Sequence, residues 1–175
     1  MSKPFDLEAE VRDLAARRDI YNVVCRYMRG QDRLLRDVQR SAFHPDAWDD
    51  CGLMAGNAWE FVDFAQDLLG RMVSTQHLIG QVLIDVHGDT ADGEVYFLAQ
   101  HRIVEEGIEK DLFVAGRYID EYTCRDGEWR IQKRRELIDW ARTDPASDAF
   151  LKENPHLPMG GRGAADFGVN REWPI

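Results

Sequence analysis

The chain has 175 residues, of which 44% are hydrophobic and 31% charged, a size and balance typical of one soluble domain with a single core. Its 32 acidic and 22 basic side chains give a formal net charge of −10. A field of this sign repels phosphate backbones and anionic membrane surfaces, so we expect neither nucleic acid nor membrane as a partner. No segment has the ~20 apolar residues of a membrane span, and the N-terminus lacks a signal-peptide pattern, which predicts a cytoplasmic protein.

The cysteines Cys25, Cys51 and Cys124 are odd in number, widely spaced and without a CxxC pair. This pattern argues against a disulfide framework and against a zinc site, so we expect small buried side chains. The sequence also has no histidine pair or carboxylate-rich loop at metal-ligand spacing, no GxGxxG string and no P-loop. These observations predict chemistry without a metal or cofactor.

The first half of the chain has helical periodicity. Residues 6–29 carry apolar side chains at mostly three- to four-residue spacing, which predicts a long amphipathic helix with Gly30 as its C-cap. A short helix is expected over 32–42, and the mixed Pro, Gly and aromatic stretch 44–57 predicts a loop with a short strand. Asn57 can cap a third helix over 58–73, whose broad apolar stripe predicts packing against a sheet.

From residue 75 onward the periodicity becomes that of strands. Four segments, 76–87, 90–105, 111–125 and 128–140, are separated by the strings HGD, EEG and RDG, which predicts an antiparallel meander. Residues 143–175 are interrupted by Pro and Gly, so we expect a tail that packs on the domain 1–142 or on a neighbouring subunit. Helices followed by such a sheet predict an α+β fold in which the helices pack inside a curved sheet.

Several strings resemble the SnoaL-like and scytalone dehydratase-like domains of the NTF2-like superfamily. They are RDI at 18–20, RYMRGQDR at 26–33, FHPD at 43–46, His77 before VLID, GDTA at 88–91, GRYIDEY at 116–122 and GEWRI at 127–131. Each string is weak alone, and their order and spacing together carry the resemblance. It implies a cone-shaped α+β domain that encloses an apolar pocket.

The resemblance also implies a set of site residues. In dehydratases of this group the end of the first helix supplies a Tyr and an Asp five residues apart, which match Tyr27 and Asp32, and His77 matches the histidine that pairs with the Asp as a general base. Tyr27 can equally be a core tyrosine, and Asp32 a helix N-cap. By simple alternation His77 shares the less apolar strand face with Asp85, so only a bulge near Gly80 would turn it toward the pocket.

His101 lies on the strand face that carries Phe97 and Ala99, so it is predicted to be a second polar group on the pocket wall, with a satisfied core histidine as the alternative. Arg135 shares strand parity with Ile131 and is therefore predicted to reach the pocket and stabilise an enolate or phenolate. Arg117 and Arg134 are the alternative candidates for this role. The candidate substrate-binding residues are Trp48, Met54, Trp59, Tyr96, Phe97 and Arg117, with ordinary packing as the alternative for the aromatic ones.

The set Tyr27, Asp32, His77, His101 and Arg135 suits abstraction of a proton beside a carbonyl group or aromatic ring, followed by loss of a leaving group. We therefore expect a dehydratase-like lyase without a cofactor. It would release water or formaldehyde from a hydrophobic, aromatic or lignin-derived diaryl substrate, as in aromatic compound catabolism, and act as a homodimer or homotrimer. The alternatives are an enzyme like ketosteroid isomerase or polyketide cyclase, a non-catalytic small subunit of a ring-hydroxylating dioxygenase, and a small-ligand carrier.

Overall fold

The computed structural model describes residues 5–173 of the chain and has an α+β fold, as predicted. The first helices and strands are α1 Leu7–Asp32, α2 Arg36–Arg40, β1 Phe43–Asp50, β2 Ala55–Asn57 and α3 Ala58–Gly70. The long strands follow as β3 Ser74–His87, β4 Thr90–Glu105, β5 Ile108–Arg125 and β6 Glu128–Pro145. The last elements are α4 Ala149–Glu153, a 3₁₀ turn at Gly163–Ala165 and α5 Phe167–Asn170.

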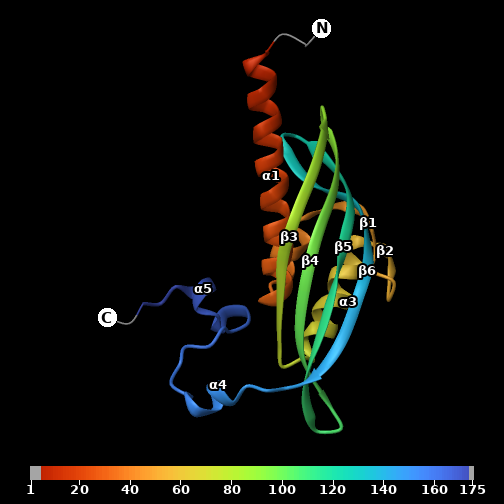
Figure 1. Ribbon diagram of the computed structural model, residues 1–175. Helices are drawn as coiled ribbons and strands as arrows, with labels where there is room; N and C mark the ends of the chain where they lie inside the picture. The colour runs from red at the N-terminus through yellow and green to blue at the C-terminus, as the bar shows by residue number, and fades with distance from the viewer. Residues whose placement is uncertain (1–4, 174–175) are drawn as a thin grey trace.

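The strands form one six-stranded sheet in the order β2-β1-β6-β5-β4-β3. The predicted meander is confirmed, because β3, β4, β5 and β6 pair in sequence and antiparallel, whereas β1 runs parallel to β6. Figure 1 shows the long strands curving past α1, with α3 behind their lower ends. The helices cover the inner face of the sheet, where the apolar core lies.

The first helix is longer than predicted, because Gly30 lies inside α1 and is not its C-cap. A Cβ atom at Gly30 would lie 2.5 Å from the backbone nitrogen of Gln39, so glycine is needed for the close approach of α2. The helix ends only after Asp32, where Arg33 N–H donates to the Arg29 carbonyl and Leu34 has a positive φ of 51°. This extension brings the last turn of α1, with its polar side chains, against β3.

The apolar stripe of α1 is buried only in its second half. Ile20 and Val24 are fully enclosed, whereas Leu7, Val11 and Leu14 are exposed. Figure 1 shows the reason, since the N-terminal end of α1 extends beside the sheet with nothing packed over it. The core of the domain therefore lies at the end of α1 that carries the predicted site residues.

Other predicted boundaries differ in detail. The helix predicted over 32–42 is reduced to α2, because the chain from residues 33 to 35 forms the turn that leaves α1. The stretch 44–57 contains two strands, β1 and β2, instead of a loop with one. Asn57 caps α3 as predicted, since its side chain accepts from the backbone N–H groups of Trp59 and Glu60. That helix ends at Gly70 and not at residue 73.

Irregularities in the strand pairing set which side chains of the sheet face the core. The pairing of β3 with β4 shifts between Ile79 and Val82, so His77 faces inward opposite Ala99. The bulge that the sequence required near Gly80 is therefore present. A second shift occurs in β6, where Tyr122 pairs with Ile131 but Glu121 pairs with Lys133. This shift leaves one extra residue in β6 and reverses the parity of the strand after it.

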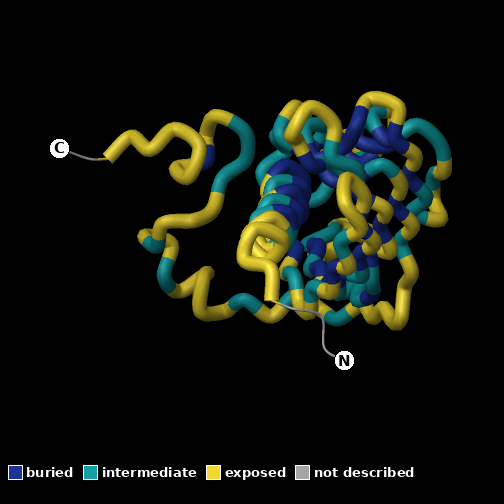
Figure 2. Tube along the Cα trace, turned by 90° about the horizontal axis from the view of Figure 1, so that it is seen from above, coloured by how far each residue is buried: buried dark blue, intermediate teal, exposed yellow. Residues whose placement is uncertain are grey.

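The C-terminal segment leaves the end of β6 and loops outside the body of the domain (Figure 2). It returns to the end of α1, where Arg29 and Arg33 donate to the carbonyls of Gly168 and Gly161 at 2.8 and 3.1 Å. Arg162 donates to the Met72 carbonyl at 2.7 Å. The tail thus packs on its own domain near the C-terminal end of α3. Within residues 5–173 no helix has the length and apolar character needed to cross a bilayer.

Candidate active site

A cavity of about 470 Å³ lies between the helices and the inner face of the sheet. Its apolar lining includes Phe61, Phe64, Leu68, Leu69 and Met72 from α3, and Phe97, Ala99, Leu112, Val114 and Ile138 from the strands. The polar side chains of the lining are Tyr27, Gln31, His77, His101, Tyr118 and Glu136. Both the volume and the few polar groups in an apolar wall are typical of a site for a small organic molecule.

His77 and Asp32 form a buried pair at this cavity. The Nδ1 atom of His77 lies 2.6 Å from Oδ1 of Asp32, and the backbone N–H of His77 donates to Oδ2 at 2.9 Å. Because a carboxylate only accepts hydrogen bonds, Nδ1 carries a proton. The end of α1 and the bulge in β3 together make this contact. The pair predicted from the family resemblance is therefore assembled, and its catalytic role stays a prediction.

Three buried glutamines continue from His77 into the protein. Gln66 Nε2 donates to the Gly30 carbonyl at 3.0 Å and to Gln39 Oε1 at 2.6 Å, and Gln39 Nε2 donates to Gln31 Oε1 at 3.1 Å. The Gly30 carbonyl can only accept, which fixes the direction of the chain. Gln31 consequently directs Nε2 to the Nε2 atom of His77, at 2.6 Å. The direction of this chain leaves Nε2 of His77 as the acceptor of the Gln31 hydrogen bond, with its lone pair directed toward Gln31.

His101 lies beside His77 on the cavity wall, as its strand face predicted. The two rings meet edge to face with their centres 5.1 Å apart. Burial, and after it the neighbouring His77, lower the pKa of His101 from its usual 6.5 to about 4. Its Nδ1 has no hydrogen-bond partner in the described part of the chain. At neutral pH the imidazole of His101 is therefore uncharged and can hydrogen-bond a ligand in the cavity.

Tyr27 lines the cavity and is also buried in the core. The two alternatives predicted from the sequence, a cavity residue and a core tyrosine, therefore both apply to it. Its ring meets Phe43 and Tyr118 edge to face, with centres 5.7 Å apart in each case. The guanidinium carbon of Arg134 lies 4.3 Å from the ring centre of Tyr27 and 4.1 Å from that of Tyr118. Burial raises the pKa of Tyr27 well above its usual value. Tyr27 is therefore a neutral phenol.

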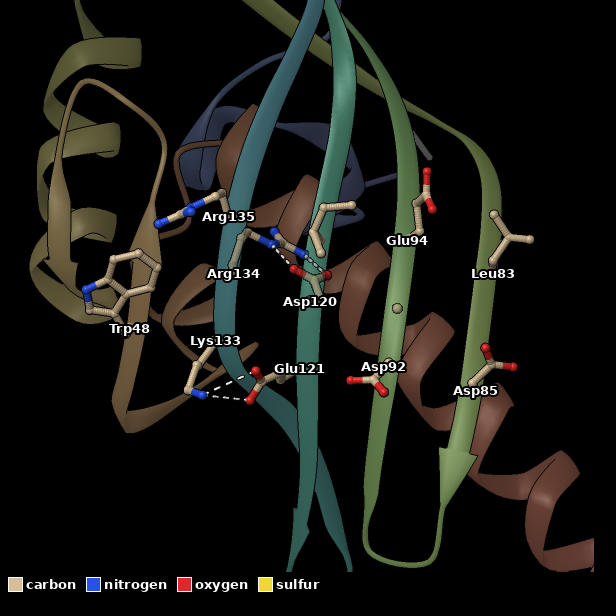
Figure 3. Close-up of a pocket in the computed structure, with 12 residues that line it drawn as sticks. Trp48, Leu83, Asp85, Asp92, Glu94, Asp120, Glu121, Lys133, Arg134 and Arg135 are labelled. Carbon is tan, nitrogen blue, oxygen red and sulfur yellow. Dashed lines mark hydrogen bonds and ion pairs between the residues drawn. The ribbon is translucent and has the colours of Figure 1, made fainter.

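Arg134 forms a fully buried ion pair below these rings. Its Nε and Nη2 atoms donate to the two carboxylate oxygens of Asp120, both at 2.7 Å, and Tyr122 donates its hydroxyl to the same carboxylate at 2.5 Å. Figure 3 shows this pair joining β6 to β5. Since Tyr27 and Tyr118 lie over the guanidinium group, Arg134 supports the cavity from behind and is not among its lining residues.

The arginines proposed from the sequence as substrate ligands lie elsewhere. Arg135 was expected to face inward, but the bulge in β6 reverses the parity after Gln132 and turns it outward. There it pairs with Asp50 at 3.1 Å, and Figure 3 shows it reaching toward Trp48. Arg117 is also on the outer face, where it pairs with Glu94 at 3.0 Å. Neither arginine lines the cavity.

Most of the predicted substrate-binding side chains also lie outside the cavity. Phe97 is the one that lines it. Trp48 and Tyr96 are on the outer side of the sheet, and Trp59 and Met54 pack against the core without lining the cavity. The outer face has its own hollow of about 640 Å³, shown in Figure 3, which is lined largely by charged side chains such as Asp85 and Lys133. That hollow contains neither histidine.

Gln31 and Glu136 are polar cavity residues that were not among the predicted ones. Gln31 is one helical turn after Tyr27, so the spacing that selected Tyr27 also places Gln31 on the same face. Glu136 alternates with Arg134 on the inner side of β6, but this parity is hidden in the sequence because no Gly or Pro marks the bulge at Gln132. A search restricted to apolar strand periodicity therefore misses it.

Asp49 is a buried acid near this site that has no compensating hydrogen bond. It is 1% exposed, and neither of its carboxylate oxygens has a partner within residues 5–173. Burial raises the pKa of Asp49 from 3.8 to about 8, Arg134 opposes this shift, and Glu136 and Asp120 add to it. At neutral pH Asp49 therefore retains its proton.

This shift makes stability depend on pH. Between about pH 4 and pH 8 the folded protein holds a proton on Asp49 that the unfolded chain releases, so the free energy of unfolding falls as pH rises through this window. Near pH 4 we expect the free energy of unfolding of Asp49→Asn to equal that of the wild type. At pH 8.5 the variant should be more stable than the wild type by about 2–5 kcal/mol. Urea unfolding at both pH values measures this. If Asp49→Asn were destabilised equally at pH 4 and pH 8.5, the prediction would be wrong.

The fold and the cavity define a class of protein, a small α+β cone with a His–Asp pair at an apolar site. The chain belongs to the SnoaL-like domain family, whose model matches residues 12–135. Among curated protein sequences, none matches the chain. The predicted membership of the SnoaL-like group is thus confirmed.

Solved structures share this fold. A hexachlorocyclohexane dehydrochlorinase, LinA type 2, is 23% identical with a TM-score of 0.70, over 79% of this chain and 94% of that one. A putative scytalone dehydratase from Novosphingobium aromaticivorans is 20% identical with a TM-score of 0.67, over 77% and 91%. A protein from Kribbella flavida is 17% identical with a TM-score of 0.67, over 81% and 99%. At these identities the likeness establishes the fold alone.

Proposed function

We propose that this protein is a lyase that works without a cofactor and eliminates water from a small hydrophobic, aromatic substrate. The observation that carries the proposal is His77, which is bonded to Asp32 through Nδ1 and lines an apolar cavity of about 470 Å³. The dehydrochlorinase and dehydratase names of two similar structures point to the same type of reaction.

The proposed reaction begins when Nε2 of His77 removes a proton from a carbon beside an electron-withdrawing group. Gln31 donates a hydrogen bond to this nitrogen, so the substrate takes the place of its amide. Asp32 stabilises the imidazolium ion that forms, because its carboxylate is already bonded to Nδ1. A well-placed base of this kind contributes about 10²–10⁴-fold to the rate.

The apolar lining selects the substrate. Aromatic and aliphatic side chains make up most of the cavity wall, and no Lys or Arg is among the lining residues within the described 5–173. An anionic substrate would lose its hydration without gaining a cation, which is unfavourable in such a cavity. An uncharged aromatic compound with one or two polar groups fits both the size and the chemistry.

The test is a screen of β-hydroxy aryl ketones and related aromatic alcohols for the ultraviolet absorbance of a new conjugated double bond. The wild-type protein should form the dehydrated product, and His77→Ala should not. A product of unchanged mass would identify an isomerase instead, and saturable binding without any product would identify a carrier. Either result would overturn the proposed elimination of water.

A further inference from the structure

Glu136 is an ionisable group of the cavity that the mechanism above does not use. It extends inward from β6, opposite Tyr118 of β5, and lines the same cavity as His77. Arg134 is the neighbouring cation, but two of its nitrogens donate to Asp120 and its Nη1 has no hydrogen-bond partner among the described residues. Glu136 is therefore not held in an ion pair with it and remains available to a ligand.

The surroundings of Glu136 favour the protonated carboxyl group. Burial raises the pKa of Glu136 above its usual value, and Arg134 and His77 only partly oppose this shift. The two ionisable groups thus differ in what they offer a ligand. His77 presents a lone pair on Nε2, whereas Glu136 presents a carboxyl group whose burial favours the protonated form. Two titratable groups kept in complementary proton states in one cavity are the usual arrangement for a base and an acid that act together.

We propose that Glu136 is a second catalytic residue, the general acid that protonates an oxygen leaving group, so that the substrates are β-hydroxy or β-alkoxy compounds and not halides. This inference rests on the proposed elimination. It adds the class of leaving group, which the His77–Asp32 pair alone does not specify.

In a β-hydroxy ketone, the C–H bond that His77 would break and the C–O bond that Glu136 would assist are on adjacent carbon atoms. His77 Nε2 takes the proton from the carbon beside the carbonyl group, and the electron pair of that C–H bond forms the C=C bond. The C–O bond breaks with its electron pair on oxygen, which takes the proton of Glu136 and leaves as water. The imidazolium ion of His77 then returns its proton to the Glu136 carboxylate, which restores both groups.

An acid is needed for oxygen but not for a halide. Hydroxide and alkoxide are strongly basic and leave slowly unless a proton reaches the oxygen in the transition state. Chloride is a weak base and leaves as the anion, so a neutral carboxyl group beside it contributes little. An acid that lines the same apolar cavity as the base is therefore expected for dehydration and is not needed for dehydrohalogenation.

The experiment compares two ketones that differ only in the leaving group, a β-phenoxy ketone and its β-(para-nitrophenoxy) counterpart. The wild-type protein should release a phenol from both. Glu136→Gln keeps the size of the side chain but has no proton to transfer, so it should slow loss of phenoxide by about 10²-fold and loss of para-nitrophenoxide by less than about threefold. The ratio of the two rates does not depend on how much of the variant is folded.

The controls separate this proposal from the proposed function. His77→Ala should abolish both reactions, and Glu121→Gln, an exposed residue of the outer face paired with Lys133, should change neither. If the wild-type protein released a phenol from neither ketone, the proposed function would be overturned. If Glu136→Gln slowed both reactions equally, or neither, the role of Glu136 would be overturned while the elimination stood.

A second measurement needs no substrate. The infrared spectrum of the wild-type protein at pH 7 should contain a protonated carboxyl band that is reduced in Glu136→Gln and retained in Glu121→Gln. Because Asp49 is also buried and protonated, the difference between wild type and variant, and not the band itself, is the relevant quantity. A difference spectrum without this band would mean that Glu136 is ionised, and the proposal would be wrong.

Discussion

Asp32→Asn is expected to lower the rate constant for elimination by about 10²–10⁴-fold while the domain stays folded. In the wild type both oxygens of Asp32 accept hydrogen bonds from His77, one from Nδ1–H at 2.6 Å and one from the backbone N–H at 2.9 Å. An asparagine can accept only one of them. If its oxygen keeps the backbone N–H, its NH₂ group faces Nδ1 and favours the ring tautomer that has its proton on Nε2. The nitrogen that should take the substrate proton is then already protonated.

The measurement combines turnover with nitrogen NMR of the His77 ring. We expect the wild-type ring to carry its proton on Nδ1 and the Asp32→Asn ring to carry it on Nε2. Asp85→Asn is a matched control on the exposed outer side of β3 and should alter neither turnover nor tautomer. Turnover of Asp32→Asn within about threefold of the wild-type value would show that the pair is not the base. His101 would then be the candidate to examine.

The fold could be predicted because its signals are local. Helical spacing, turn strings and the change to strand periodicity near residue 75 each follow from short-range chemistry, and they gave the element order and the meander. His77 faces inward because of one bulge in β3. Gly80 indicates this bulge in the sequence, because glycine inside a strand commonly accompanies a bulge. The sequence therefore predicts an inward-facing His77 on the condition that β3 has a bulge near Gly80, and the structure has this bulge.

The irregularity in β6 has no such mark. Gln132 is an ordinary strand residue, so alternation from Ile131 predicted Arg135 on the inner face, whereas the bulge places Arg134 and Glu136 there. A one-residue shift moves the side chains that follow it to the opposite face, which is why one unseen bulge replaces Arg135 by Arg134 and Glu136 on the inner side. Gly30 was misread for a related reason. Its role depends on the approach of α2, a tertiary contact that local spacing does not encode.

Arg134→Met is expected to lower the free energy of unfolding by about 3–5 kcal/mol. Arg134 is 1% exposed and satisfies both oxygens of Asp120, which is itself 2% exposed. Removing the guanidinium group leaves this carboxylate buried with only the hydroxyl of Tyr122 as a partner. It also removes the cation packed against the rings of Tyr27 and Tyr118. Urea unfolding at pH 7 measures the loss.

Arg135→Met is a matched control for this loss, because it changes the next residue of the same strand. Arg135 is largely exposed and its pair with Asp50 is at the surface, so its removal should cost less than about 1 kcal/mol. The double change Arg134→Met with Asp120→Leu should recover part of the lost stability, since an apolar pair leaves no buried charge unpaired. If the double variant were less stable than Arg134→Met alone, the loss would come from packing against Tyr27 and Tyr118. The buried carboxylate would then not be its cause.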